Sequence, residues 1–252
     1  MRITNEDIGS YQLNGFLIIK NLIQKKIIED IKEDAENIFR RQLNRCDYST
    51  DDLERNLYLF FKEDQEGFIN CGKHIQHLIS LHKLSLSDTI IDILKKLGLE
   101  TPNICTRPTC YFNSKYLAVK DVYHTVPPHQ DWKSMQGSLD SMVVWLPLVK
   151  VDKKLGALEV VPKSHKMGLL TTHVEDSFGM VGDKFCDNDF VSVELEVGDA
   201  LFFSSFLVHR SGQNETESIR WSCHMRYNNL DDEDFISRKF PHPYIYKSKI
   251  ND

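Results

Sequence analysis

The sequence lacks the features that mark several large classes of protein. Its 252 residues include six cysteines and no CxxC pair, which argues against a disulfide-rich scaffold or a zinc ribbon. Lys and Arg total 31 against 37 Asp and Glu, so there is no excess of positive charge to neutralise nucleic acid phosphates. No apolar run approaches the roughly eighteen residues of a membrane span, and the N-terminus lacks the apolar stretch of a signal peptide. We therefore expect a cytoplasmic protein with reduced thiols and no nucleic-acid or membrane partner, whereas the oligomeric state is left open.

Helical periodicity occupies the first hundred residues. Thr4 or Asn5 is placed to cap a helix through Leu13, which Asn14 and Gly15 then end. A short β-rich run follows at 16–19, and apolar spacing predicts helices over 23–43, 73–84 and 86–97. The charged and aromatic stretch from 46 to 68 is interpreted as an ordinary packed helix, with a cover over the barrel mouth or a dimer contact as alternatives.

Short runs of β-branched and aromatic residues follow, separated by turn signals. They predict strands at 104–112, 141–148, 157–161, 191–195, 200–204 and 218–228. Many short strands behind a helical leader favour a mainly β fold, a double-stranded β-helix (jelly-roll, cupin-like) barrel with N-terminal helices packed outside. We predict a single domain over 1–252, helix-rich over 1–100, with a barrel core at about 101–230 and a short C-terminal tail.

Three residues have the types and spacing of a metal site. His129 and Asp131 are separated by one residue, and His209 lies eighty residues further on. On a strand, alternate side chains face the same side, so His129 and Asp131 could reach one metal while Gln130 points away. Two imidazoles and one carboxylate form the facial triad that holds non-heme Fe(II) and leaves positions open. We predict His129, Asp131 and His209 as both metal ligands and catalytic residues.

The strand that contains Arg220 supports the same chemistry. Strict alternation puts Ser218, Arg220, Ser222, His224 and Arg226 on one face and apolar residues on the other. If the apolar face contacts the helices, the polar face must line a ligand-filled lumen, because an unpaired buried charge is costly. Arg220 and Ser222 then become candidates for the far carboxylate of 2-oxoglutarate, since an arginine clamps carboxylates well. The alternative is an edge strand with its polar face in water.

An ordered series of motifs extends these observations over most of the chain. The series contains Asn14-Gly15-Phe16-Leu17, His129-Gln130-Asp131, Trp145-Leu146-Pro147-Leu148, Gly156-Ala157-Leu158-Glu159-Val160-Val161-Pro162 with Ser164-His165, Gly198-Asp199-Ala200-Leu201-Phe202-Phe203, His209-Arg210-Ser211-Gly212-Gln213-Asn214 and Arg220. It resembles the phytanoyl-CoA dioxygenase family of Fe(II)/2-oxoglutarate-dependent oxygenases. The chain departs from the family at Leu155-Gly156, where Asn-Gly is common, and at Pro162-Lys163-Ser164-His165, where Pro-Gly-Ser-His is common. Both departures lie in turns and leave the metal residues in place.

The resemblance implies a role for each matching residue. His129, Asp131 and His209 would bind iron, Arg220 would anchor 2-oxoglutarate with help from Ser211, and Trp145 would line the co-substrate pocket. Related halogenases replace the carboxylate by a small residue, so Asp131 argues for hydroxylation or another oxidation instead. The implied cofactors are Fe(II), 2-oxoglutarate and O2, with ascorbate in support, and the products include succinate and CO2.

Several residues near the metal pair are candidates for contact with the substrate. We predict a small molecule, contacted by Trp132, Lys133, His224 and Arg226, with Tyr123 and His124 in the loop before the triad. The segment 165–189 contains three glycines and is a candidate lid. Two alternatives within enzymes are a metal-dependent hydrolase on a cupin-like barrel and a protein hydroxylase. A third alternative is a catalytically silent barrel that binds a metal or a small ligand.

Overall fold

The computed structural model describes residues 3–46, 52–117, 126–170, 181 and 184–241. The N-terminal part is helical, as predicted. Helix α1 (Asn5–Asn14) begins at Thr4, whose hydroxyl accepts from the Asp7 amide while the Asp7 carboxylate accepts from the Thr4 amide. It ends at Gly15, which has a positive φ of 84° that glycine adopts without strain. The predicted cap and end of this helix are therefore both confirmed.

Five further helices follow among the described residues of the first hundred. They are α2 (Lys25–Arg45), α3 (Leu53–Glu63), α4 (Gln65–Ile75), α5 (Ile79–Ser85) and α6 (Asp88–Leu97). Helix α2 buries Ile28, Ile31, Ala35, Phe39 and Leu43, which recur at the three- and four-residue spacing of one helical face. The predicted helix over 73–84 is wrong in its bounds, because the chain breaks between α4 and α5. The stretch interpreted as a packed helix contains α3 and the start of α4.

In the part of the chain that the structure describes, the strands form two antiparallel sheets. The large sheet has the order β1-β6-β3-β8-β2 and the small sheet the order β5-β4-β7. Their bounds are β1 (Phe16–Ile19), β2 (Pro102–Asn113), β3 (Met142–Pro147), β4 (Leu158–Val160), β5 (Val191–Val193), β6 (Ala200–Ser204), β7 (His209–Ser211) and β8 (Arg220–Asn229). All six strands predicted between 104 and 228 are confirmed, with small differences at their ends. The two sheets form a jelly-roll that is not closed into a continuous barrel.

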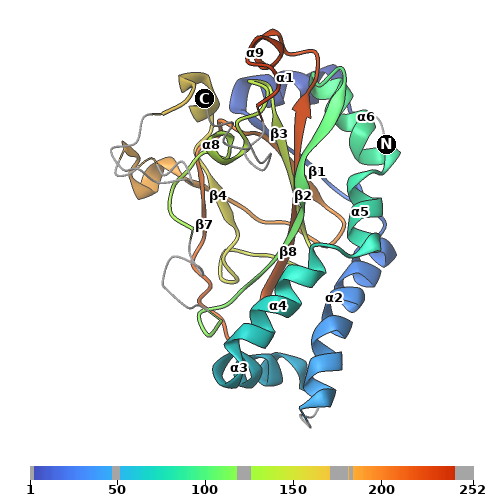
Figure 1. Ribbon diagram of the computed structural model, residues 1–252. Helices are drawn as coiled ribbons and strands as arrows, with labels where there is room; N and C mark the ends of the chain where they lie inside the picture. Colours follow the sequence, from blue (N-terminus) through green and yellow to red (C-terminus); the bar gives the residue numbers. More distant parts are fainter. Residues whose placement is uncertain (1–2, 47–51, 118–125, 171–180, 182–183, 242–252) are drawn as a thin grey trace, which may run out of the picture.

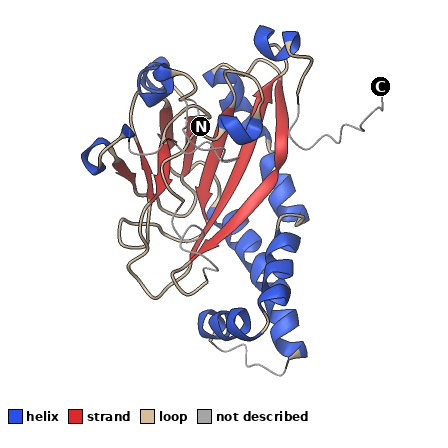
Figure 2. Cartoon of the chain, turned by 60° about the vertical axis from the view of Figure 1, so that its left-hand side comes forward, coloured by secondary structure: helices blue, strands red, loops and turns tan. Residues whose placement is uncertain are grey.

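Helices α2 to α6 cover one face of the large sheet, and the small sheet lies across its other face (Figures 1 and 2). Among the described residues, two large buried apolar clusters follow from this arrangement, beside a small third one of Val161, Leu170, Val181 and Val208. The larger one contains apolar side chains from the helices α2, α3, α4, α5 and α6 and from the face of the large sheet that these helices cover. The smaller one lies between the sheets and includes Val143, Trp145 and Phe203 from the large sheet and Leu158 and Val160 from the small one.

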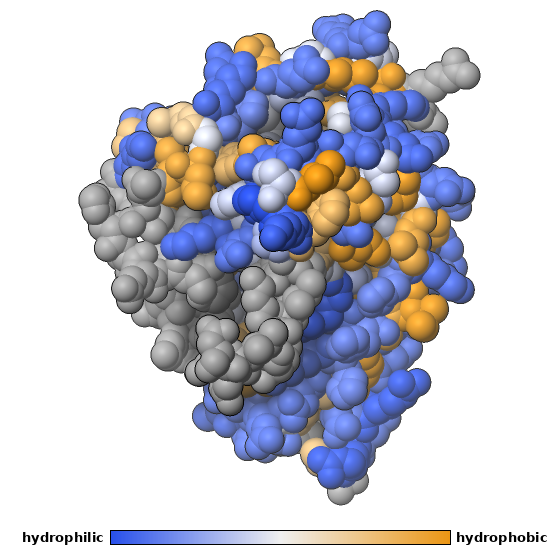
Figure 3. All heavy atoms as spheres, turned by 45° about the horizontal axis from the view of Figure 1, so that its top comes forward, coloured by the Kyte–Doolittle hydropathy of each residue, from blue (hydrophilic) through white to orange (hydrophobic). Residues whose placement is uncertain are grey.

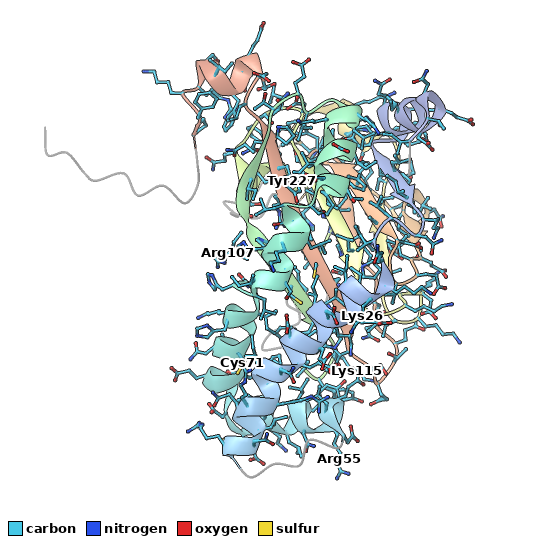
Figure 4. All side chains as sticks on the ribbon, turned by 90° about the vertical axis from the view of Figure 1, so that its right-hand side faces the viewer. Lys26, Arg55, Cys71, Arg107, Lys115 and Tyr227 are labelled. Carbon is cyan, nitrogen blue, oxygen red and sulfur yellow. The ribbon has the colours of Figure 1, made fainter. Side chains whose placement is uncertain are left out.

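Strand β8 connects these two environments. Ile219, Trp221, Cys223, Met225 and Tyr227 pack in the helical layer, so the predicted division of its two faces is confirmed. The Tyr227 hydroxyl donates to the Ser85 carbonyl of α5 at 2.7 Å, and burial raises the pKa of Tyr227. Figure 4 shows Tyr227 on β8 behind the helical layer. The alternative of a water-facing edge strand is wrong, because β2 is the edge and β8 lies inside the sheet.

The described C-terminal part ends in helix α9 (Glu233–Ser237). Arg238, directly after it, donates to the carbonyls of Gln136 and Gly137, so α9 is fastened to the loop that follows the predicted metal residues. The face of the molecule that includes α1 and α9 is largely hydrophilic, with separate groups of hydrophobic side chains (Figure 3). Among the described residues, no helix is long and apolar enough to cross a membrane.

Candidate metal and co-substrate site

The predicted metal residues come together at the end of the small sheet. His209 begins β7, and His129 forms an isolated antiparallel bridge with it, with both backbone amides donating across the pair at 3.0 and 3.1 Å. Asp131 is not on a strand, in contrast to the sequence prediction. Its backbone is helical, with φ −67° and ψ −26°, and it directly precedes the short helix α8 (Trp132–Met135). The direction of the Asp131 carboxylate toward the two histidines therefore depends on the turn into α8 and not on strand alternation alone.

Both imidazoles are oriented by backbone carbonyls. The Nδ1 atom of His129 lies 2.8 Å from the Pro127 carbonyl oxygen, and Nδ1 of His209 lies 3.0 Å from that of Leu207. Because a carbonyl oxygen only accepts, each Nδ1 is assigned as the donor, and each Nε2 keeps its lone pair. Such contacts fix the tautomer and ring orientation that a metal ligand requires.

The three side chains are close enough to share one metal ion. One ligand atom from each of His129, Asp131 and His209 lies within 4.8 Å of the others, and the two ring centroids are 4.1 Å apart. The Oδ2 atom of Asp131 is 3.7 Å from Nε2 of His209 and has no hydrogen-bond partner among the described residues. A buried carboxylate oxygen without a partner is the place where a cation fits.

Burial and charge set the protonation states of this cluster. Burial lowers the pKa of His209 to about 3, so this ring is neutral and able to bind a metal at ordinary pH. Burial alone would raise the pKa of Asp131, but the Arg226 guanidinium, His209 and His129 together outweigh this effect and hold the pKa below its usual range. The site therefore offers an ionised carboxylate and a neutral imidazole without any change of pH.

Gln130 points away from the metal residues, as predicted. It is fully buried, and its amide nitrogen donates to the carbonyls of Gly168 and Phe206. Its amide oxygen accepts from the backbone of Leu170 at 2.8 Å. Gln130 thus holds the 168–170 segment next to the metal residues. This role was not predicted from the sequence.

Arg220 lies deep between the sheets and is 4% exposed. Its Nη1 donates to the Gly156 carbonyl, whereas its Nε has no partner and it makes no ion pair with any described residue. Burial lowers the pKa of Arg220 to about 10, so it stays charged at neutral pH. A buried cation without a counter-ion is unfavourable on its own and favourable once an anion arrives.

Three other polar atoms in the same interior also have no hydrogen-bond partner among the described side chains and backbone. They are Nε1 of Trp145, Oγ of Ser222 and Nδ1 of His224. The register pairs Trp145 with His224 across β3 and β8, and the His224 ring also contacts Tyr111 of β2, with centroids 4.7 Å apart. Burial lowers the pKa of His224 well below its ordinary value. Arg220, Ser222, Trp145 and His224 thus present a charge and several hydrogen-bonding atoms to one interior.

Two glycines shape the end of this interior near Arg220. A Cβ atom on Gly156 would lie 2.7 Å from the Gly212 carbonyl oxygen, and one on Gly212 would lie 2.3 Å from the Ala157 carbonyl oxygen. Gly156 also has a φ of +81°, which favours glycine. This close approach presents the Gly156 carbonyl to Arg220. The turn was predicted, but its contact with Arg220 was not.

The other predicted residues are distributed around the site. Ser211 is on β7, where its amide donates to the Val126 carbonyl, and no described contact joins it to Arg220. Trp132 stacks on Phe206 with ring centroids 5.4 Å apart, and Lys133 follows it in α8. Arg226 contacts Asp131 directly, through a bond of 2.9 Å. Tyr123 and His124 lie outside the described residues, as do 171–180 and 182–183 of the candidate lid predicted over 165–189.

Comparison with known proteins identifies the family of this chain. A sequence profile of the family described as phytanoyl-CoA dioxygenase (PhyH) matches residues 11–222, which is most of the chain. The chain belongs to the phytanoyl-CoA dioxygenase family. The peroxisomal phytanoyl-CoA dioxygenase of Homo sapiens is 27% identical over 248 residues, which covers 88% of this chain and 68% of that protein. The methylphosphonate hydroxylase of Gimesia maris is 32% identical over 107 residues, covering 42% of this chain and 40% of the relative.

Solved structures agree on the fold. The α-ketoglutarate-dependent carbocyclase SnoK superposes with a TM-score of 0.64 at 16% identity, over 98% of this chain and 95% of that one. The epimerase SnoN, in complex with Fe3+ and α-ketoglutarate, gives 0.62 at 16% identity, over 89% and 82%. These likenesses confirm the jelly-roll fold. Family membership, together with the His-Asp-His cluster, confirms the predicted dioxygenase class and its cofactors, iron and 2-oxoglutarate.

Proposed function

We propose that this family member is a single-domain oxygenase that hydroxylates a small molecule and releases succinate and CO2. The proposal is supported mainly by one observation: the same interior contains two groups of side chains that each lack a binding partner among the described residues. The His129, Asp131 and His209 cluster has an unpartnered carboxylate oxygen, and Arg220 is a buried cation without a described counter-ion. A metal ion would complete the first site, and an anion would complete the second.

Each part of the site has a task in this reaction. His129, Asp131 and His209 would hold Fe(II), and Arg220 would bind the distal carboxylate of 2-oxoglutarate, because its guanidinium has donors to spare. Ser222 and Trp145 would supply further hydrogen bonds along the same interior, and Ser211 would add another from β7. When bound, the iron supplies the redox chemistry that couples oxidation of 2-oxoglutarate by O2 to oxidation of the substrate.

The surroundings also protect the reaction from water. His209, Asp131, Ser222 and Trp145 are almost fully buried. The stacked pair of Trp132 and Phe206 forms an aromatic wall directly after Asp131. An enclosed site strengthens the ion pair between Arg220 and a carboxylate, and it limits side reactions with solvent.

The reactions of relatives support a small-molecule substrate. Phytanoyl-CoA dioxygenase and methylphosphonate hydroxylase carry hydroxylation or oxygenation in their names, whereas SnoN is an epimerase and SnoK a carbocyclase. We propose hydroxylation because Asp131 is present, and Trp132, Lys133 and His224 are proposed to face the substrate. A metal-dependent hydrolase would leave the buried Arg220 without a task.

Binding of 2-oxoglutarate to the metal-loaded protein tests the proposal. Under anaerobic conditions, Fe(II) and 2-oxoglutarate together should give a visible charge-transfer absorption that neither gives alone, because chelation joins the keto oxygen to iron. The His129→Ala variant should lose this absorption. If 2-oxoglutarate does not bind the Fe(II)-loaded wild-type protein, the hydrolase or the silent barrel becomes the better account.

A further inference from the structure

Arg226 lies at the opposite end of the β8 interior face from Arg220. The register places it opposite Val143 of β3 and Thr106 of β2. Its Nη2 donates to Oδ1 of Asp131 at 2.9 Å, and the two side chains are 14% and 4% exposed. Although burial opposes its charge, Asp131 raises the pKa of Arg226 above its usual value. Arg226 is therefore joined to a metal residue by a buried ion pair.

This contact makes the two oxygens of Asp131 different. Oδ1 is engaged by Arg226, whereas Oδ2 has no hydrogen-bond partner among the described residues and lies on the side of His209. Only Oδ2 is left with its full capacity to bind a metal.

The backbone of Asp131 is also fixed. Its carbonyl accepts from the amides of Ser134 and Met135 in α8 and from the Ser134 hydroxyl. The freedom that remains to the carboxylate is rotation about its own side-chain bonds. A second, charged contact at Oδ1 removes that rotation, in the way that contacts beyond the ligands orient metal-binding groups.

The number of oxygens that Asp131 contributes decides how many positions stay open. In a six-coordinate ion, His129, His209 and one oxygen of Asp131 leave room for a bidentate co-substrate and one further molecule. A carboxylate bound through both oxygens would take that last position. We propose that Arg226 is a positioning residue that limits Asp131 to ligation through Oδ2 and so keeps the position for O2 open.

This inference rests on the proposed function in assigning the open position to O2. The control of Asp131 by Arg226 does not depend on the proposed function, because it concerns how Asp131 binds any divalent ion. It also gives Arg226 a task other than the substrate contact predicted from the sequence. A substrate contact would leave the metal unchanged in the absence of substrate, whereas a positioning role of Arg226 would change how Asp131 binds the metal.

The test uses Mn(II) alone as the probe and counts the waters bound to it from line broadening of its EPR signal in 17O-enriched water. The variants are R226M and R226Q, which remove the charge, and R226K, which keeps it. R220M is the matched control, since it removes an arginine from the same face of β8 without touching Asp131. Circular dichroism establishes that each variant is folded, and R226Q carries the same prediction if R226M does not fold.

R226M and R226Q should each bind Mn(II) with one water fewer than wild type, because both oxygens of Asp131 become ligands. R226K and R220M should keep the wild-type number. With Fe(II) and 2-oxoglutarate, R226M should also bind nitric oxide, a stand-in for O2, at least about tenfold more weakly than wild type. Rescue by lysine is a result that a merely structural role of Arg226 would not give.

An unchanged water count in R226M and R226Q would overturn the inference, as would a folded R226M that loses Mn(II) affinity without losing a water. A raised KM for substrate at an unchanged water count would assign Arg226 to the substrate instead. If wild type binds Mn(II) but not 2-oxoglutarate, the proposed function fails while the water count still decides the role of Arg226. Absence of Mn(II) binding by wild type would overturn both.

Discussion

Replacing Arg220 by methionine should separate co-substrate binding from folding. Arg220 is 4% exposed and donates one hydrogen bond to the Gly156 carbonyl, while its Nε has no partner among the described residues. Charge-assisted hydrogen bonds contribute about 1.5–3 kcal/mol each, so a two-point contact with a carboxylate supplies about 3 kcal/mol or more. Since 1.4 kcal/mol is a factor of ten in affinity, R220M should raise the Kd for 2-oxoglutarate by roughly two orders of magnitude.

The same substitution should not weaken the protein when 2-oxoglutarate is absent. Methionine removes a buried cation that has no counter-ion among the described residues, and such replacements are often neutral or stabilising. The free energy of unfolding of the unliganded protein, measured by urea titration, should therefore be unchanged or higher in R220M. Wild type should gain stability on addition of 2-oxoglutarate with Mn(II), and R220M should gain little.

Equilibrium titration with 2-oxoglutarate under anaerobic conditions provides the measurement, with R220K as the control that keeps the charge but loses the planar fork. R220K should fall between wild type and R220M. The reasoning is refuted if R220M binds 2-oxoglutarate as tightly as wild type. It is equally refuted if unliganded R220M loses about 2 kcal/mol of stability, because Arg220 would then serve the fold.

Three further predictions concern the frame of the site. Gly156→Ala should lower the thermal midpoint by several degrees, because the new methyl meets the Gly212 carbonyl at a positive φ; an unchanged midpoint would argue against the close approach. Tyr227→Phe should cost about 1 kcal/mol in urea unfolding, since the Ser85 carbonyl loses its buried donor, and a neutral effect would contradict this bond. Burial lowers the pKa of His165 below its ordinary 6.5; the unfolded chain therefore takes up the proton first, and the stability present above pH 6.5 is lost as the pH falls. The His165→Gln variant should lose less stability between pH 7 and pH 5, and parallel wild-type and variant curves would refute the assignment.

Most of the secondary structure could be predicted because it depends on local patterns. The cap at the start of α1 and the glycine that ends this helix belong to short-range chemistry. The division of β8 into a polar and an apolar face follows from alternation alone, and burial of Arg220 and Trp221 on opposite faces confirms it. The break between α4 and α5 was missed because the apolar spacing continues across it.

The metal cluster could be predicted because its residue types are so restrictive, but its local geometry could not. Alternation on a strand predicted that His129 and Asp131 face one side, and they do meet at one site. The route differs, since Asp131 lies in the helical turn that begins α8. Only the fold brings Arg226 to Asp131, because 95 residues separate them in the chain. The contacts of Gln130 and Gly156 likewise depend on segments far away in sequence.

Oxygen-dependent formation of succinate tests the central claim most directly. Purified protein should be incubated with Fe(II), ascorbate, 2-oxoglutarate and O2, alone and with a pool of small metabolites, beside the Asp131→Ala variant. We expect slow succinate formation by wild type, faster formation with part of the pool, and none by the variant, which lacks a ligand of the metal cluster. Absence of succinate from the metal-loaded wild type under every condition, or equal formation by Asp131→Ala, would contradict the account.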